Sequence, residues 1–274
     1  MSIQSSLSTS KYQVGLIGVG IMGEALISGL VSSRFPKAQI VFTDKRVDRA
    51  REISTKYGAR EVELAELAKS SDVILLVVKP QDLADLLESI SKDLNKKALL
   101  VSFAAGKTSE FISGKVGENV SVIRVMPNTP TLIGLGMAAI SLGANVSQEQ
   151  EKFVNDFLAT CGKVISVDEN LQDAVTAVSG SGPAYFFAFV EEMIKSGIAL
   201  GLSSEQATTL AVQTIIGSAA MLEQSGKTAT TLRENVTSPN GTTAAALKVF
   251  GDANLGEIIE KAMTAARDRS QELA

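Results

Sequence analysis

The chain has 274 residues, of which 45% are hydrophobic and 20% are charged, and these proportions are typical of a folded globular protein. A net charge of −4 argues against nucleic-acid binding, which requires a basic surface. There is no histidine and only one cysteine, Cys161. Histidine-based catalytic triads, His-ligated metals and an internal disulfide are therefore excluded, and we expect no metal site. Any catalysis must use hydroxyls, lysine, carboxylates, backbone groups or a cofactor.

No segment supplies the roughly 18 consecutive apolar residues of a membrane span, so we expect no membrane association. The opening stretch Met1–Ser10 is polar and lacks the charged start and apolar run of a signal peptide. We interpret residues 1–10 as a flexible tail. A single thiol fits a reducing compartment, and we expect a cytoplasmic protein.

From residue 11 to 167, short apolar runs alternate with segments of helix-forming composition such as 24–33 and 48–57. Most runs are continuous rather than alternating, as in strands buried on both faces of a parallel sheet. The pattern predicts a doubly wound, Rossmann-type α/β domain. The apolar runs are Val14–Ile17, Ile40–Phe42, Val73–Val78, Ala98–Phe103, Val120–Val125, Met137–Ser141 and Val164–Val167.

From residue 168 to 274 the strand-like runs stop and Ala-rich helical stretches follow. Asp168 is a candidate N-cap, and Ser203 with Gln206 forms a candidate capping box. A further helix is predicted to start at Asn254, with Ile258, Ile259, Ala262, Met263 and Ala266 sharing one face. Such small side chains bury little area within about 100 residues, so we expect this helical domain to pair with a second copy, as a homodimer or as the unit of a larger homo-oligomer.

The sequence Gly18-Val19-Gly20-Ile21-Met22-Gly23 follows the first apolar run and opens a helix. In a strand–turn–helix context this pattern is typical of dinucleotide binding. Gly18 permits the tight turn, Gly20 lets the backbone approach a pyrophosphate, and Gly23 allows helix and strand to pack closely. The alternative is an ordinary glycine-rich turn.

The end of the second predicted strand, which commonly selects between NAD and NADP, gives a mixed signal. Asp44 lies where an acidic residue would bind a ribose hydroxyl. Lys45 and Arg46 are instead suited to a 2′-phosphate, and Thr43 is able to donate to it. The alternative for Lys45 and Arg46 is a solvated charged loop.

Three further segments follow predicted strands at the edge where doubly wound sheets bind ligands. They are Val77-Val78-Lys79-Pro80, Phe103-Ala104-Ala105, and Met126-Pro127-Asn128-Thr129-Pro130. Lys79 is either a ligand group or a solvent-facing lysine. Asn128 and Thr129 either face a nicotinamide or cap the turn.

Two motifs stand out in the helical half. In Val178–Tyr185, Gly180, Gly182 and Pro183 interrupt a helix-like stretch, which indicates a close neighbour, either another helix or a ligand. In Leu232–Ala244, hydroxyl residues surround a Pro-Asn-Gly turn that leads into a helix start. Free N–H groups and hydroxyls at such a start are suited to holding a carboxylate, although a plain Ser/Thr N-cap is the alternative.

Together these motifs resemble pyrroline-5-carboxylate reductases, from Val14 to about Leu273. The stretches 178–185 and 232–247 carry most of the resemblance. It implies a Rossmann domain, a helical dimerisation domain, and NAD(P)H-dependent hydride transfer to the imine carbon of 1-pyrroline-5-carboxylate, which gives L-proline. NADPH is the expected coenzyme, with NADH also possible.

The resemblance also implies site residues. The substrate carboxylate is expected at Ser238, Asn240, Gly241, Thr242 and Thr243, with Thr243 bonding the ring nitrogen as the catalytic residue. Ile17, Gly18, Val19, Gly20, Ile21 and Met22, together with Val77–Pro80 and Phe103–Ala105, match cofactor-contacting segments. Two departures are Asn240, where many members have glycine, and the charged pair Asp44 and Lys45.

Two other functions remain open at this point. A β-hydroxyacid dehydrogenase has a similar first motif, but it expects a catalytic lysine soon after a Gly-Ser-Gly run, whereas the next lysine here is Lys195. A non-catalytic cofactor sensor has no need of the segment 237–243. An assay of NAD(P)H consumption with the imine separates all three.

Overall fold

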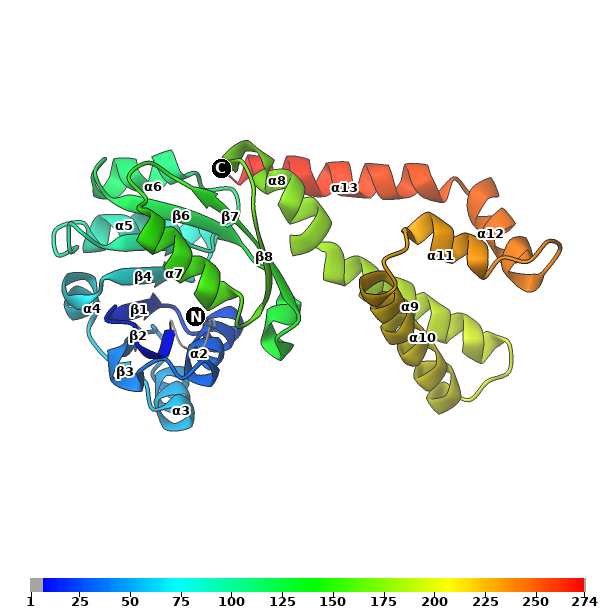
Figure 1. Cartoon of the computed structure of the whole chain (residues 1–274), viewed down its shortest axis with the longest axis horizontal. Coiled ribbons are helices and arrows are strands. Elements are labelled where there is room, and N and C mark those ends of the chain that lie inside the picture. The colour runs from blue at the N-terminus through cyan, green and yellow to red at the C-terminus, as the bar shows by residue number, and fades with distance from the viewer. Residues whose placement is uncertain (1–6, 274) are drawn as a thin grey trace. The chain divides into compact units, whose positions relative to one another are not determined.

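The computed structural model describes residues 7–273, and its first unit is built on a twisted sheet (Figure 1). Within these residues the sheet has eight strands in the order β3-β2-β1-β4-β5-β6-β7-β8. The strands are β1 (Val14–Ile17), β2 (Ile40–Thr43), β3 (Arg60–Glu61), β4 (Val73–Leu76), β5 (Leu99–Ser102), β6 (Ser121–Met126), β7 (Gly136–Leu142) and β8 (Gly162–Ser166).

Continuous apolar strands are explained by helices on both faces of the sheet. Successive side chains alternate between two hydrophobic clusters: Leu75 belongs to one and Leu76 to the other. The first cluster includes side chains from α2 (Ile21–Ser32), α3 (Val47–Tyr57) and α7 (Gln148–Leu158). The second includes side chains from α4 (Leu64–Ser70), α5 (Leu83–Ile90) and α6 (Ser109–Val116). The predicted doubly wound domain is confirmed.

One feature of the predicted sheet is wrong. Strands β1 to β6 pair in parallel, but β7 runs antiparallel to β6, with Val125 opposite Ile140. The connection holds only the short 3-10 helix η3 (Thr129–Ile133), and a parallel crossover needs about a dozen residues or more. The chain therefore reverses direction, and β8 then pairs in parallel with β7.

The chain divides into two compact units. The first runs to Ser181 and also includes the chain from Ala266 onward, and the second spans Gly182–Ala265. This division comes later than the predicted boundary at residue 168. The intervening turns η4 (Glu169–Leu171), α8 (Gln172–Val175) and the π-helical η5 (Thr176–Gly180) belong to the first unit. Buried Gln172 explains this, because its side-chain amide donates to Ala139 O and Ser141 Oγ of β7.

The predicted tail, residues 1–10, lies partly outside the described residues. Leu7 is buried in the first hydrophobic cluster, so the described end of that segment packs on the domain. Two short 3-10 helices complete the first unit, η1 (Lys37–Gln39) and η2 (Pro80–Asp82).

The second unit is entirely helical in its regular structure. Its helices are α9 (Gly182–Ala199), α10 (Ser204–Gln224), α11 (Ala229–Asn235), α12 (Thr242–Asp252) and most of α13 (Leu255–Glu272). The predicted capping box is confirmed, since Ser203 and Gln206 bond reciprocally at the start of α10. Helix α13 begins directly after Asn254, as expected. Asp168 occupies an N-cap position, but its side chain makes no capping bond.

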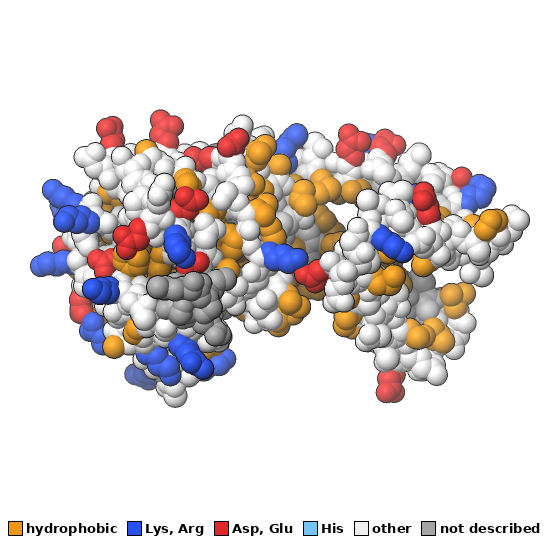
Figure 2. Space-filling view, in the orientation of Figure 1, with side chains coloured by type: hydrophobic (Ala, Val, Ile, Leu, Met, Phe, Trp, Pro, Cys, Tyr) orange, Lys and Arg blue, Asp and Glu red, His pale blue; other side chains and the backbone are white. Residues whose placement is uncertain are grey.

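This helical unit buries little of its own apolar surface. Among its described residues, the buried hydrophobic side chains are those of Ala207 and Ala211. Phe186 and Phe187 are 62% and 68% exposed. Figure 2 shows hydrophobic side chains at the surface of this unit. None of the described helices is long and apolar enough to cross a bilayer.

Candidate active site

The glycine turn joins β1 to α2 and has the geometry that its sequence predicts. Gly18 has a φ of +93°, and a Cβ there would lie 2.4 Å from the carbonyl oxygen of Val77. A Cβ on Gly23 would lie 2.3 Å from Gly18 O, whereas a Cβ on Gly20 would meet nothing within 4 Å. Gly20 is the N-cap of α2 and no side chain caps the helix there. The turn therefore leaves backbone N–H groups and open space at the start of α2, an arrangement that is suited to a phosphate.

Asp44 and Arg49 both hydrogen-bond to the backbone of this turn. The N–H of Val19 donates to Asp44 Oδ2 at 2.8 Å, and Arg49 Nε donates to Val19 O at 2.8 Å. Arg49 Nη2 also reaches Gly20 O at 3.5 Å. Sequence reasoning did not identify Arg49, because its role depends on how α3 packs beside the turn.

A second set of contacts joins Arg49 to helix α2. Its guanidinium pairs with Glu24 in the first turn of α2. Within α3 it also pairs with Glu52, at 2.6 Å. Lys56 and the Tyr57 hydroxyl also donate to Glu24, at 2.8 and 2.9 Å. These bonds, that of Lys56 first and that of Arg49 next, lower the pKa of Glu24 to about 2. The Glu24 carboxylate therefore stays ionised, and Arg49 and Lys56 compensate its negative charge.

Lys45 and Arg46, the predicted 2′-phosphate ligands, are exposed directly after β2. The Arg46 side chain is 59% exposed and its Nε lies 3.4 Å from Asp44 Oδ1. Thr43, the last residue of β2, bonds Gly18 N through its carbonyl at 2.9 Å. Thr43 and Asp44 therefore contact the glycine turn, and Lys45 and Arg46 are exposed next to them in the sequence.

The other predicted cofactor segments meet at the same edge of the sheet. Val77 N bonds Ile17 O at 2.9 Å, and Phe103 N bonds Leu76 O at 3.1 Å. The ends of β1, β4 and β5 are thereby joined side by side. Lys79 is exposed at this edge, at the N-cap of η2, before Pro80.

Asn128, which follows β6, makes two side-chain hydrogen bonds. Its Oδ1 accepts from Met137 N at 2.8 Å, and its Nδ2 donates to Ser179 Oγ at 3.3 Å. Ser179 lies in the π-helical turn η5, and such turns are frequent at functional sites. Gly180 in the same turn packs closely, because a Cβ there would lie 2.4 Å from Met126 Cε. For Gly182 no such neighbour is found within 4 Å.

The hydroxyl-rich segment forms a tight turn at the start of α12 in the helical unit. Gly241 N bonds Ser238 O at 3.0 Å, and Asn240 has a φ of +58°, the left-handed conformation that glycine adopts readily. The N-cap is Gly241 and it makes no side-chain bond, so neither Thr242 nor Thr243 is the N-cap of this helix. The helix start thus offers N–H groups and hydroxyls together.

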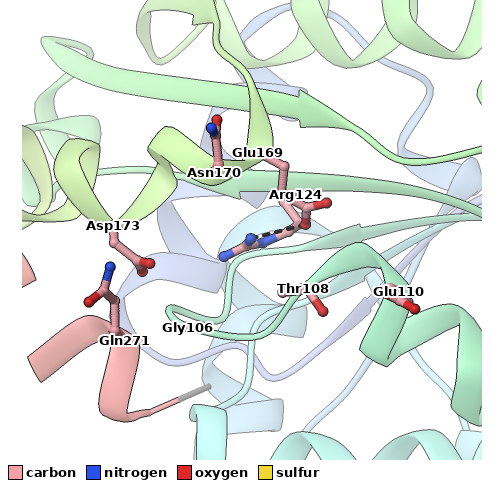
Figure 3. Close-up of a pocket in the computed structure, with 8 residues that line it drawn as sticks. All are labelled: Gly106, Thr108, Glu110, Arg124, Glu169, Asn170, Asp173 and Gln271. Carbon is pink, nitrogen blue, oxygen red and sulfur yellow. Dashed lines mark hydrogen bonds and ion pairs between the residues drawn. The ribbon is translucent and has the colours of Figure 1, made fainter. Parts of the chain in front are cut away.

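A separate pocket of about 350 Å³ lies elsewhere in the first unit (Figure 3). At its wall the guanidinium of buried Arg124 pairs with Glu169 at 3.0 Å, and Glu169 also accepts from Ser109 N and Oγ. Burial raises the pKa of Glu169, but the bonds from Ser109 and Arg124 outweigh it and lower the pKa overall. None of the predicted site residues lines this pocket. The Arg124–Glu169 ion pair joins η4 to strand β6 of the sheet.

The comparisons with known proteins show which family this chain belongs to. A family model described as pyrroline-5-carboxylate reductase dimerisation matches residues 169–273, and one described as NADP oxidoreductase, coenzyme F420-dependent, matches residues 13–106. A pyrroline-5-carboxylate reductase of Pseudomonas aeruginosa is 39% identical over 264 residues, covering 96% of this chain and 97% of that protein. The chain belongs to the pyrroline-5-carboxylate reductase family.

Other members of the family support the same assignment. Pyrroline-5-carboxylate reductase 1 of Bacillus subtilis is 37% identical, covering 96% of this chain and 89% of that protein. The pyrroline-5-carboxylate reductase structure from Coxiella burnetii has a TM-score of 0.90 at 32% identity, covering 97% of this chain and 99% of the other. The Plasmodium falciparum enzyme, solved with NADP bound, has a TM-score of 0.87 at 30% identity, covering 96% and 98%. The predicted fold class, family and oxidoreductase class are confirmed.

Proposed function

We propose that this reductase transfers hydride from NAD(P)H to the imine carbon of 1-pyrroline-5-carboxylate and releases L-proline, the last step of proline biosynthesis. The observation that carries the proposal is the turn 238–243, where hydroxyls and N–H groups meet at the uncapped start of α12. A β-hydroxyacid dehydrogenase needs a lysine soon after its Gly-Ser-Gly run, and the next lysine after that run in this chain is Lys195.

The coenzyme is proposed to bind at the edge formed by the first unit's strand ends. Its pyrophosphate would lie on the turn Gly18–Gly23, where Gly20 leaves space and α2 has no side-chain cap. Lys45, Arg46 and Thr43 would receive the adenosine end. Residues 77–80, 103–105 and Asn128 would receive the nicotinamide end. When bound, the coenzyme supplies the hydride that reduces the imine carbon.

The chain's own residues then bind and orient the imine. Ser238, Asn240, Gly241 and Thr242 would hold the substrate carboxylate through hydroxyls and amide N–H groups. The Thr243 hydroxyl would bond the ring nitrogen and fix which carbon faces the coenzyme. An imine that binds already protonated needs no strong side-chain acid during hydride transfer, because the hydride adds to the iminium carbon while the C=N π electrons move to nitrogen, which becomes the amine nitrogen of proline.

The same proposal assigns a different binding role to each of the two domains. Residues 11–167 would bind the coenzyme, and residues 168–274 would bind the substrate and a second copy of the chain. The exposed Phe186 and Phe187 support the pairing, because such large apolar side chains are normally covered. We also propose a cytoplasmic location, since the single cysteine, Cys161, is a free thiol and fits a reducing compartment.

Coenzyme oxidation by the purified full chain tests the proposal. NADPH should be consumed only when 1-pyrroline-5-carboxylate is present, and proline should appear in equal amount. A β-hydroxy acid with NADP⁺ should give no turnover. Activity with the hydroxy acid alone, or coenzyme binding without turnover of either substrate, would contradict the proposal.

A further inference from the structure

The central residue of the glycine turn, Val19, has both of its peptide groups tied to side chains. Asp44 Oδ2 accepts the Val19 N–H at 2.8 Å, and Arg49 Nε donates to the Val19 carbonyl at 2.8 Å. Both side chains come from the segment that follows β2, at the N-terminal end of α3. Two peptide planes are thus oriented by one neighbouring segment.

Peptide planarity transmits this orientation to the groups that face a phosphate. In a trans peptide the C=O and N–H point in opposite directions. Because Val19 C=O points to Arg49, the N–H of Gly20 points away from Arg49. Because Val19 N–H points to Asp44, the carbonyl of Gly18 points away from Asp44, and a Cβ on Gly23 would lie 2.3 Å from that oxygen. The two side chains therefore determine the shape of the turn on which a pyrophosphate rests.

The Asp44 carboxylate has little capacity left for a ribose hydroxyl. Its Oδ1 accepts Arg46 N at 2.9 Å and Arg46 Nε at 3.4 Å, while Oδ2 accepts Val19 N. Only 9% of its side-chain surface is exposed. Arg49 is similarly engaged, with 14% exposed and bonds to the turn and to Glu24 and Glu52.

We propose that Asp44 and Arg49 are positioning residues that shape the pyrophosphate-binding turn, and that Asp44 does not select NADH by binding the ribose. The inference rests on the proposed function, because it assumes that the coenzyme binds at this turn. It implies that both residues affect NADH and NADPH equally, since the two coenzymes share the pyrophosphate. Selectivity between NADH and NADPH would then depend on the exposed Lys45 and Arg46.

Dissociation constants for NADPH and NADH, measured by fluorescence titration of the full chain, test this inference. Asp44→Ala and Arg49→Lys should each weaken both coenzymes on the order of tenfold, and the ratio of the two constants should change less than about twofold. Asp44→Asn keeps the side-chain volume and one acceptor oxygen, so it decides the question if Asp44→Ala does not fold. Asp48→Asn is the control, because it removes an exposed charge in the first turn of α3.

Two results would overturn the inference. Weaker NADH binding with unchanged or tighter NADPH binding in the Asp44 variants would make Asp44 a ribose ligand. Unchanged constants for both coenzymes, with only a lower melting temperature, would make the contacts purely structural. A parent chain that binds neither coenzyme would instead refute the proposed function, together with the coenzyme role of both residues.

Discussion

Thr243 occupies the second position of α12, and Gly241 is the N-cap. Its hydroxyl is therefore not the N-cap of the helix. If it bonds the ring nitrogen, Thr243→Val should lower kcat/KM for the imine by roughly ten- to a hundred-fold, from a loss of about 1.5–3 kcal/mol. Thr243→Ala should be similar, and Thr243→Ser should retain most activity.

Melting temperature and coenzyme affinity, measured on the same three Thr243 variants, provide the control. Both should change little, because the hydroxyl acts on the substrate. A loss of about 1 kcal/mol of stability with kcat/KM intact would indicate that the hydroxyl only stabilises the start of the helix. Thr243→Val with the parent's kcat/KM would show that another group orients the imine.

Coenzyme preference is a second property of single residues. We expect both coenzymes to work and NADPH to be favoured through Lys45 and Arg46. Replacing both by alanine should reduce the NADPH:NADH ratio of kcat/KM about tenfold, since bonds to the extra phosphate contribute about 1.5 kcal/mol when the cations are exposed. Steady-state kinetics with each coenzyme measure this ratio. A preference for NADH that survives the double replacement would contradict the assignment.

At the scale of elements, Glu24 links α2 to α3 through Arg49, Lys56 and Tyr57. Its pKa falls from the usual 4.5 to about 2, chiefly through the bond from Lys56 and then that from Arg49. A lowered folded-state pKa stabilises the protein above the unfolded-state pKa, and that stability is lost as the pH falls from about 4.5 towards 2.

Urea unfolding across this pH range tests the link on the parent and on Glu24→Gln. The variant should be less stable at neutral pH, and its free energy of unfolding should fall less steeply between about pH 4.5 and 2. Glu52→Gln is a suitable control, because Glu52 is more exposed and pairs only with Arg49 among the described ion pairs. Equal slopes for parent and Glu24→Gln would contradict the assigned pKa.

Local sequence patterns predicted most elements. The strands β1, β2 and β4 to β8 were recognisable because each is a run of apolar residues, and α10 because Ser203 and Gln206 form a capping box. The reversal at β7 was missed, since an apolar run does not encode strand direction. Arg49 was missed, and so was the bond between Ser179 and Asn128 within the flagged stretch 178–185, because each contact joins residues distant in sequence. The positive φ of Asn240 fits its place in a Pro-Asn-Gly turn.

In the molecule as a whole, the helical unit exposes large apolar side chains that we expect another protein surface to cover. Phe187 and Leu210 are 68% and 57% exposed. We expect a stable homodimer, alone or as the unit of a larger assembly, and Phe187→Glu should weaken it because burying a charge in an apolar interface is costly. Sedimentation at several concentrations measures the change. Leu142→Glu, at a 42% exposed position in the first unit, is the control. A stable, active parent monomer would refute the prediction.

The proposed reaction moves hydride directly from the nicotinamide to the imine carbon. Isotope tracing tests it most directly: the full chain is given 1-pyrroline-5-carboxylate and NADPH carrying deuterium at the transferable position of nicotinamide carbon 4. Mass spectrometry and NMR should find one deuterium per proline, at the former imine carbon, and none should enter from deuterated solvent at that carbon. Proline without that deuterium, or label lost to solvent, would contradict direct transfer.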